Sequence, residues 1–329
     1  MSSNPKVSVI VPIYKVRDFI ARCAESLMEQ TLADVEYIFV DDCTPDDSIS
    51  VLESVLVKYP ERKEMVRILR HEQNKGLPSA RNTGLRSACG EYVFHCDSDD
   101  YVEKDMLEKM VCAAEEDEAD FVWCDWYLTF ERKERYMKEP EADRPETALK
   151  NVLSGIMKYN VWNKLVKRSI YQAHNIWFPD GYGMGEDMTM IRLLAHARSV
   201  RYVNEAFYHY VRTNTEAFTH RISDKHLEAL IFNTQSTIDY LRNIFGNKYD
   251  LEIAFFQQNV KLPFLISSER KDYMIWQIMY PESNPYILEN KQMSLRTRVL
   301  QWSAYKKRYW YVRLYNMMIT MYYKRFSHE

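Results

Sequence analysis

Three carboxylates follow an apolar run in "YVFHCDSDDYV" (residues 92–102), namely Asp97, Asp99 and Asp100. In extended backbone the side chains at i and i+2 point the same way, so Asp97 and Asp99 project into the same space. Two hard oxygen ligands with open positions beside them suit Mg²⁺ or Mn²⁺, which also takes phosphate oxygens and water. The same spacing fits a solvated acidic turn that caps the following helix, and the short motif alone does not separate the two.

Several other binding motifs are absent from the chain. A calcium-binding EF-hand loop would need Asp or Asn at the fifth position and Gly at the sixth, where Tyr101 and Val102 stand. The eight glycines form neither G-x-x-x-x-G-K-[ST] nor a G-x-G-x-x-G after a strand, and the six cysteines contain no C-x-x-C pair that would indicate zinc. A bound phosphate would therefore have to be held through the metal.

Two further acidic pairs occur at Asp41–Asp42 in "FVDDCTPDDS" and Glu186–Asp187 in "GEDM". A carboxylate beside a second acid can have its pKa raised, which suits a general base. The alternative for the second pair is an acidic helix start, since acids favour the first turn. Pro45 stiffens the first of these segments, and Cys43 stands where a glycine would allow positive φ at little cost.

The elements that must position these groups alternate between strand and helix. Strands are expected at 6–14, 35–40, 65–69, 91–96 and 119–124, and helices at 16–30, 46–58, 78–88 and 104–116. This alternation predicts a Rossmann-like, mostly parallel sheet with right-handed crossovers, whose ligands bind beyond the carboxyl ends of the strands. The acidic clusters at 41–42 and 97–100 both lie at such ends, so we expect them to share one crevice.

The second half of the chain is less regular and then helical. Helices are expected at 147–159, 188–197, 224–245, 249–267 and 295–325, with two short strands in 200–213. Pro12 is expected to end the first strand. A length of 329 residues suggests two domains, which we place at 1–215 and 216–329.

The charge of the chain is unevenly distributed. The net charge is −3, yet residues 291–329 contain nine Lys or Arg and one acid, which leaves the remainder weakly acidic. This aromatic, basic tail predicts either an interfacial helix on anionic lipid or a helix packed on the catalytic domain or across a homodimer. The acidic body and the absence of a recognition motif argue against nucleic-acid binding. There is no signal peptide pattern and no apolar window of 18 residues, so a cytoplasmic protein is expected. The lipid-binding alternative for the tail would place it peripherally on the inner face of the membrane.

The motifs "SVIVPIY", "FVDDCTPDDS", "NKGLPSARNTGL", "GEYVFHCDSDDYV" and "GEDM" occur in the order seen in family 2 inverting glycosyltransferases, which the chain resembles over residues 6–215. The resemblance implies the GT-A fold and a nucleotide-sugar donor, of which UDP-sugars are the commonest. It places Pro12 and Tyr14 against the nucleoside base, Asp41 as acceptor of a hydrogen bond from the base, and Arg81 in the donor pocket. A strand-ending turn accounts equally well for Pro12 and Tyr14, and a surface position for Arg81.

The resemblance also implies the reacting groups. Asp97 would lie near the ribose or sugar and Asp99 would bind Mn²⁺ or Mg²⁺, with Asp97 and His209 as further metal ligands. Asp187 would be the catalytic base and Glu186 its partner or an acceptor contact. A lone histidine is more often structural, which is the alternative for His209.

The expected activity is metal-dependent, inverting transfer of a sugar to a hydroxyl of a glycan or polyprenyl-linked acceptor, in surface polysaccharide synthesis. Two alternatives stay open: a non-catalytic nucleotide-sugar binding or membrane-associated scaffold subunit, and nucleotidyl transfer on a similar sheet. The second would commonly bring a glycine-rich loop after the first strand, and "PIYKVRD" contains no glycine. The pattern Gly181, Gly183 and Gly185 predicts a loop that moves over the donor.

Overall fold

A computed structural model describes residues 5–183, 185–212, 224–266 and 270–326, without the side chains at 187, 224, 270 and 319–326. The chain divides into two compact units. Unit 1 comprises Met1–Leu149 and Tyr159–Asn233, and unit 2 comprises Lys150–Lys158 and Thr234–Glu329. The predicted boundary between residues 215 and 216 lies outside the described residues.

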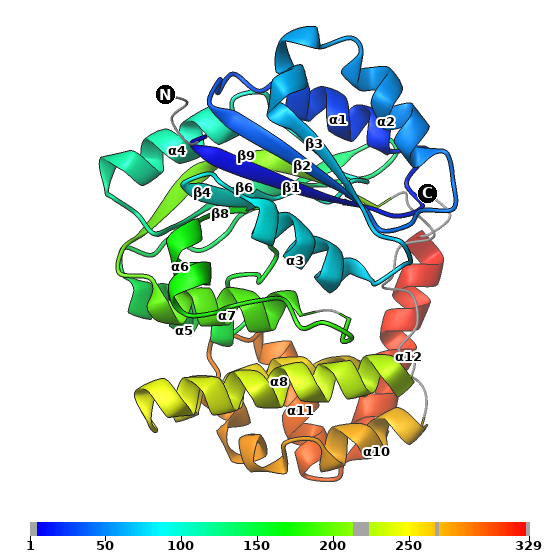
Figure 1. Cartoon of the computed structure of the whole chain (residues 1–329). Helices are drawn as coiled ribbons and strands as arrows, with labels where there is room; N and C mark the ends of the chain where they lie inside the picture. The colour runs from blue at the N-terminus through cyan, green and yellow to red at the C-terminus, as the bar shows by residue number, and fades with distance from the viewer. Residues whose placement is uncertain (1–4, 184, 213–223, 267–269, 327–329) are drawn as a thin grey trace. The chain divides into compact units, whose positions relative to one another are not determined.

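Unit 1 is built on one mixed sheet, drawn at the top of Figure 1. Its strand order is β3-β2-β1-β4-β8-β6-β9-β5, with β7 paired to β6. The β3-β2-β1-β4 part is parallel as predicted, whereas β8 is antiparallel to both β4 and β6. The strands are β1 (Val7–Ile13), β2 (Val35–Asp41), β3 (Val66–Arg70), β4 (Tyr92–His95), β5 (Tyr101–Val102), β6 (Phe121–Thr129), β7 (Glu134–Met137), β8 (Lys164–Lys167) and β9 (Val200–Val211).

Helices cover both faces of this sheet. In the parallel part, α1 and α2 lie on one side and α3 on the other (Figure 1), as right-handed crossovers require when the strand order reverses at β1. The helices of unit 1 are α1 (Ile20–Met28), α2 (Ser48–Leu56), the short 3₁₀ helix η1 (Pro60–Met65), α3 (Leu77–Ser87), α4 (Met106–Glu116), α6 (Arg168–Ala173) and α7 (Glu186–His196). Two helices, α5 (Pro145–Leu153) and α8 (Asp224–Phe245), contribute to both units.

Some expected boundaries were wrong for identifiable reasons. The first strand continues through Pro12 to Ile13, since its pairing with β4 ends at Ile10 and the missing N–H of Pro12 removes no bond of that ladder. Residues 200–211 form one strand instead of two, because a register irregularity opposite Asp125 absorbs the polar interruption. The helix expected at 295–325 is broken at 306–308, where Lys307 adopts a φ of 58°.

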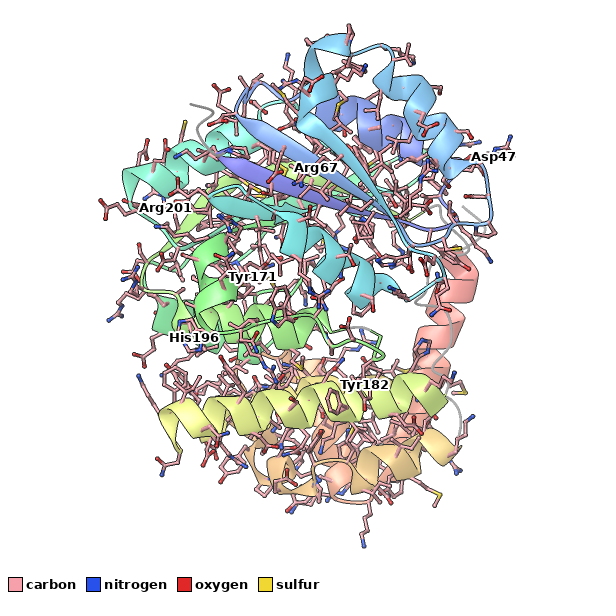
Figure 2. All side chains as sticks on the ribbon, viewed as in Figure 1. Asp47, Arg67, Tyr171, Tyr182, His196 and Arg201 are labelled. Atoms are coloured by element: carbon pink, nitrogen blue, oxygen red, sulfur yellow. The ribbon has the colours of Figure 1, made fainter. Side chains whose placement is uncertain are left out.

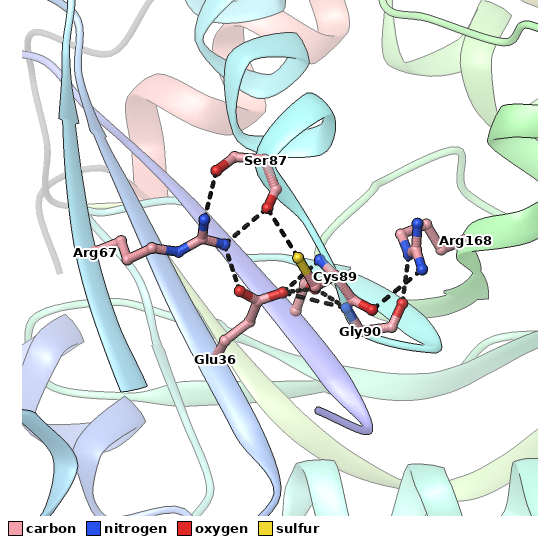
Figure 3. Close-up of polar contacts among 7 residues, drawn as sticks. Glu36, Arg67, Ser87, Cys89, Gly90 and Arg168 are labelled. Atoms are coloured by element: carbon pink, nitrogen blue, oxygen red, sulfur yellow. Dashed lines mark hydrogen bonds and ion pairs between the residues drawn. The ribbon is translucent and has the colours of Figure 1, made fainter. Parts of the chain in front are cut away.

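The amino-terminal edge of the sheet is fastened by a buried carboxylate. Glu36 of β2 accepts hydrogen bonds from the Ser8 hydroxyl and from the backbone N–H groups of Cys89 and Gly90 (Figure 3). Arg67 of β3 pairs with the other oxygen of Glu36 and also donates to the Ser87 carbonyl. The network ties the end of α3 to β1, β2 and β3, at the edge opposite to the predicted crevice.

Unit 2 is helical. It contains α9 (Asp250–Ile266), α10 (Arg270–Ile278), the 3₁₀ helix η2 (Pro281–Leu288), α11 (Leu295–Tyr305) and α12 (Tyr309–Phe326). Lys261 is fully buried in it, and its ammonium donates to the carbonyls of Met279 and Tyr280 and to Asn284 Oδ1. Three acceptors match the three N–H groups of the ammonium, so this lysine is structural. Over the described residues, no helix has both the length and the apolar character to cross a bilayer.

Candidate active site

The predicted donor-binding residues of the first half lie at one edge of the sheet. Asp41 is the last residue of β2, Tyr14 directly follows β1, and Asp97 comes two residues after β4. Because β1 lies between β2 and β4 and all three strands are parallel, their carboxyl ends meet at the same edge. The two acidic segments of the expected crevice therefore follow the two strands that flank β1, at the same edge of the sheet.

Arg81 connects the second acidic segment to the start of α7. Its Nη2 donates to Asp97 Oδ1 at 2.7 Å, and its Nη1 donates to Glu186 Oε1 at 2.6 Å. The guanidinium is 1% exposed, while each carboxylate exposes about a quarter of its side chain. Burial opposes the charged form of Arg81, but the two carboxylates outweigh it and raise the pKa of Arg81. The surface-arginine alternative is thus excluded, and three remote segments share one ion cluster.

Glu186 has an unusual carboxyl group within this cluster. Burial raises its pKa above 4.5 and the nearby Asp97 charge adds to the effect, although Arg81 acts in the opposite direction. A carboxyl group held in this way can accept or donate a proton nearer to neutral pH than an ordinary glutamate. Asp187 follows it in the first turn of α7, and its side chain is outside the described ones.

Helix α3 also fixes the segment that leads into α7. The fully buried Asn82 accepts from the Phe178 N–H and donates to the Phe178 carbonyl and to Asp180 Oδ1. Gly185 precedes α7 with a φ of −88°, so its role is space: a Cβ there would lie 2.1 Å from the Pro179 ring. The sequence reasoning missed Asn82, although it lies next to Arg81 in the quoted "SARN" motif.

The remaining carboxylates of the 97–100 segment have different surroundings. Asp100 is buried and accepts from the Tyr208 hydroxyl and the Val211 N–H, both at 2.7 Å, so it braces β9 instead of capping α4. Burial, followed by the charges of Asp99 and Asp97, raises the pKa of Asp100 well above its usual range. Asp99 is only partly buried.

The donor set fits a divalent cation that completes its coordination with substrate oxygens. No group of three His, Cys, Asp or Glu side chains within the described ranges has the arrangement of a metal site. The charges of Asp99 and Asp97 nevertheless add to the effect of burial in raising the pKa of Asp100, and Arg81 supplies one positive charge to the cluster. Mg²⁺ and Mn²⁺ commonly use one or two carboxylates together with phosphates and water, which is what Asp97 and Asp99 offer.

His209 is engaged by other groups. Its Nδ1 lies 2.8 Å from Glu134 Oε1 and its Nε2 lies 2.9 Å from Glu103 Oε1. Its ring is stacked on Tyr101 at 4.2 Å and on Tyr127 at 4.8 Å between centroids. A metal-binding role for His209 would require one of these carboxylate contacts to break, so the geometry favours the structural alternative.

The residues expected at the nucleoside base differ in accessibility. Pro12 is buried in β1, whereas the Tyr14 ring is exposed and available for stacking. Asp41 Oδ1 accepts from the Thr44 N–H at 2.9 Å, which holds the following turn. Cys43 adopts a φ of 54° in that turn, so the left-handed conformation expected of a glycine is kept in spite of the side chain. Asp42 is buried and accepts from the N–H groups of residues 75 and 76.

An aromatic cluster lies beside the acidic segment. Trp162 is stacked on Tyr208 at 4.4 Å and on Tyr210 at 5.5 Å between ring centroids. Burial and the charges of Asp100, Asp97 and Asp99 raise the pKa of the partly exposed Tyr210. Lys164, fully buried next to Asn163, has its pKa lowered to about 8 by burial. Tyr208 and Tyr210 were not singled out from the sequence, because their approach to Asp97–Asp100 depends on where β9 lies.

A further aromatic residue near the ion cluster of Arg81 is Tyr171 of α6, which is among the side chains labelled in Figure 2. Its ring is buried, and burial raises its pKa although the Arg81 charge opposes the change. The Arg81 guanidinium also lies 5.5 Å from the centroid of the Phe178 ring. Phe178 is therefore the ring nearest to the buried guanidinium in these contacts, and Tyr171 is near enough for the Arg81 charge to act on its pKa.

Comparison with known proteins shows to which family the chain belongs. Residues 8–175 match the family model described as "Glycosyl transferase family 2". The chain is 35% identical to the uncharacterized glycosyltransferase EpsJ of Bacillus subtilis over 65% of this chain and 63% of the relative. It is 32% identical to the putative glycosyltransferase EpsH of the same organism over 79% and 71%.

Among solved structures, S. aureus TarS 1–349 in complex with UDP-GlcNAc has a TM-score of 0.69 at 19% identity, with coverage of 94% of this chain and 90% of that one. This likeness confirms the expected GT-A fold with its helical carboxyl-terminal region.

Proposed function

The chain belongs to glycosyl transferase family 2, and on that premise we propose that it transfers a sugar, with inversion, from a nucleotide-sugar donor to a hydroxyl group of a glycan or lipid-linked acceptor. The observation that carries the proposal is the Arg81 bridge between Asp97 and Glu186. It unites the candidate donor-binding segment with the start of α7, where inverting transfer needs its base.

The donor is proposed to lie along the carboxyl edge of β1, β2 and β4. The exposed Tyr14 ring would stack on the nucleoside base next to Pro12, and Asp41 would accept a hydrogen bond from it. A UDP-sugar is the first candidate, since the TarS structure with a similar fold holds UDP-GlcNAc. Arg81 would keep Asp97 oriented toward the ribose or the sugar.

Asp99 and Asp97 are the residues that would hold Mn²⁺ or Mg²⁺. When bound there, the ion would neutralise charge that develops on the departing nucleoside diphosphate. His209 is left out of this set because Glu103 and Glu134 occupy its ring nitrogens.

Asp187 is assigned the role of the base that takes the proton of the acceptor hydroxyl. Glu186 stays in its contact with Arg81 and fixes the first turn of α7, on which Asp187 is the next residue. Attack on the anomeric carbon from the side opposite to the leaving group inverts its configuration in one displacement. The partly exposed Tyr210 ring, stacked on the buried Trp162, is the aromatic group beside the carboxylates on which a sugar ring would pack.

The biological setting is proposed to be the synthesis of a cell-surface polysaccharide at the inner face of the membrane, with a polyprenyl-linked acceptor. The two relatives from Bacillus subtilis carry the names uncharacterized and putative glycosyltransferase, which supports the reaction type and leaves the sugar and the acceptor to experiment. A homodimer is compatible with this setting and stays a prediction.

The test is a screen of nucleotide sugars with Mn²⁺ for binding and for slow donor hydrolysis, followed by variants. Asp99→Ala and Asp187→Asn are expected to lower turnover by about a thousandfold, because each removes a group that acts in the transition state. Asp143→Asn is the matched control, since this carboxylate is exposed. Donor binding without any turnover would instead identify a binding subunit, and near-normal turnover of Asp187→Asn would remove that residue from the mechanism.

A further inference from the structure

Helix α12 of unit 2 has one face packed on protein. Val312, Tyr315 and Asn316 are buried, and the Asn316 amide donates to the Leu265 carbonyl at 3.2 Å and to the Tyr273 hydroxyl at 2.9 Å. These contacts anchor the helix to α9 and α10. This face of α12 is therefore packed within unit 2, while packing on the catalytic domain or across a homodimer stays a prediction.

The opposite face of α12 presents large apolar side chains to solvent. The members of this α12 stripe are Trp310, Leu314, Met317 and Met318, which are 67%, 42%, 50% and 52% exposed. At 100° per residue they fall within an arc of roughly 100°, centred nearly opposite the buried face. A contiguous apolar stripe of this kind is uncommon on a soluble surface and marks an interaction site.

Positive charge surrounds the stripe. Lys306, Lys307 and Arg308 are exposed directly before α12, and Arg313 is exposed beside the stripe on the helix itself. None of these four forms an ion pair with another residue in the described ranges, whereas Lys306 lies over the Trp302 and Tyr305 rings. Across residues 291–329 the sequence has nine Lys or Arg and a single acid, Glu329.

The apolar stripe and the surrounding cations together indicate what kind of partner binds this face of α12. An apolar protein partner would cover the stripe but leave the cations without counter-charge, and a second copy of α12 would bring like charges together. Nucleic acid would pair with the cations but leave the apolar side chains in water. An anionic bilayer surface satisfies both, because Trp and Met enter the headgroup boundary while Lys and Arg remain among the phosphates.

We propose that the α12 stripe and its four flanking cations form a docking face for an anionic lipid bilayer. The inference deepens the proposed lipid-linked acceptor but rests on unit 2 alone, so it can fail or succeed independently of the transfer reaction. The helix lies on the bilayer surface through one face, while its other face remains packed on α9 and α10.

Sedimentation of the full chain with vesicles tests the proposal. Binding is expected with phosphatidylcholine vesicles that contain 30% phosphatidylglycerol, and little or none with pure phosphatidylcholine. Each cation near an anionic surface contributes about fivefold in affinity, so Lys306→Gln/Lys307→Gln/Arg308→Gln is expected to weaken binding about 100-fold. Trp310→Ser/Leu314→Ser/Met317→Ser is expected to weaken it at least tenfold.

A matched control replaces apolar side chains that are equally exposed but lie on another helix of the same unit. Met274→Ser/Ile278→Ser removes two side chains of α10, 60% and 77% exposed, and is expected to leave vesicle binding unchanged. All three variants are expected to keep the thermal unfolding temperature and the donor hydrolysis of the wild type. Asp99→Ala is expected to lose transfer and still sediment with vesicles, which separates the two proposals.

Three results would overturn the docking face. The first is no sedimentation of the wild type with anionic vesicles, and the second is equal sedimentation with neutral ones. The third is a change of oligomeric state in the Trp310 variant by light scattering without any loss of vesicle binding, which would assign the stripe to a protein interface.

Discussion

The Arg81 bridge gives a prediction whose size follows from the structure. Replacing Arg81 by Met removes two charge-assisted hydrogen bonds and leaves Asp97 and Glu186 facing one another with three-quarters of each side chain buried. Removing one partner of a buried ion cluster costs about 3–5 kcal/mol. For a unit of this size each kcal/mol lowers the unfolding temperature by about 2–4 °C, so we expect a decrease of about 6–20 °C at pH 7.

The pH dependence of this loss has a definite sign. The pKa of Glu186 is raised in the folded state above 4.5, so this group lowers the free energy of unfolding as pH rises from 4.5 through the folded value. Arg81 restrains that shift, and without it the pKa of Glu186 rises further. The stability gap between wild type and Arg81→Met is therefore expected to be largest near neutral pH and to narrow as pH falls toward 4.5.

Calorimetry or circular dichroism melting at pH 4.5, 6 and 7.5 measures the gap. Arg86→Met is the control, because Arg86 lies on the same helix, is exposed and is 4.0 Å from Asp180, so its loss is expected to cost less than about 0.5 kcal/mol. Arg81→Lys should be intermediate, since an ammonium keeps the charge but not the fork that reaches both carboxylates. An Arg81→Met protein that melts within 2 °C of wild type, or a gap independent of pH, would refute the reasoning.

Three other predictions concern the framework of unit 1. Cys43→Gly is expected to raise the free energy of unfolding by about 1 kcal/mol in urea titrations, because φ is 54° there, and Cys43→Ala is expected to give no gain. The pKa of Lys164 is lowered from 10.5 to about 8, so between these pH values the unfolded chain holds a proton that the folded chain has lost. The free energy of unfolding of the wild type, relative to that of Lys164→Met, is therefore expected to rise by about 3 kcal/mol from pH 8 to pH 10.5. A difference between the two proteins that does not change with pH in urea titrations contradicts this. Gly90→Ala is expected to cost at least about 2 kcal/mol because a Cβ would lie 2.6 Å from the Ser8 nitrogen, whereas Cys89→Ala, at an exposed site, should melt like wild type.

The C-terminal edge of the sheet illustrates how far local patterns reach. An apolar run that ends in Asp41 or Asp97 indicates a buried strand followed by an acidic turn, because burial and turn chemistry act within a few residues. The crossover rule then places both turns at one edge. The antiparallel strand β8 between β4 and β6 could not be foreseen, since its four residues carry no signal of direction or neighbour.

The surroundings of single side chains were harder to predict. His209 could be read from the sequence as a ligand or as a structural residue, and only the approach of Glu103 and Glu134 distinguishes the two. Asp100 belongs to an acidic turn that the sequence pattern could assign to capping the following helix, and its contacts with Tyr208 and Val211 show that it braces β9. These partners are more than 100 positions away from Asp100 in the sequence, beyond the reach of any periodicity.

The sequence by itself determined the alternation of strands and helices, the acidic ends of two strands and the basic, aromatic character of the last 39 residues. Each of these depends on side chains within one element. Only the tertiary structure decided that Arg81 joins Asp97 to Glu186, and which face of α12 is left to solvent. The physical reason is that charge pairing and burial are settled between elements, by the distances at which packing holds them.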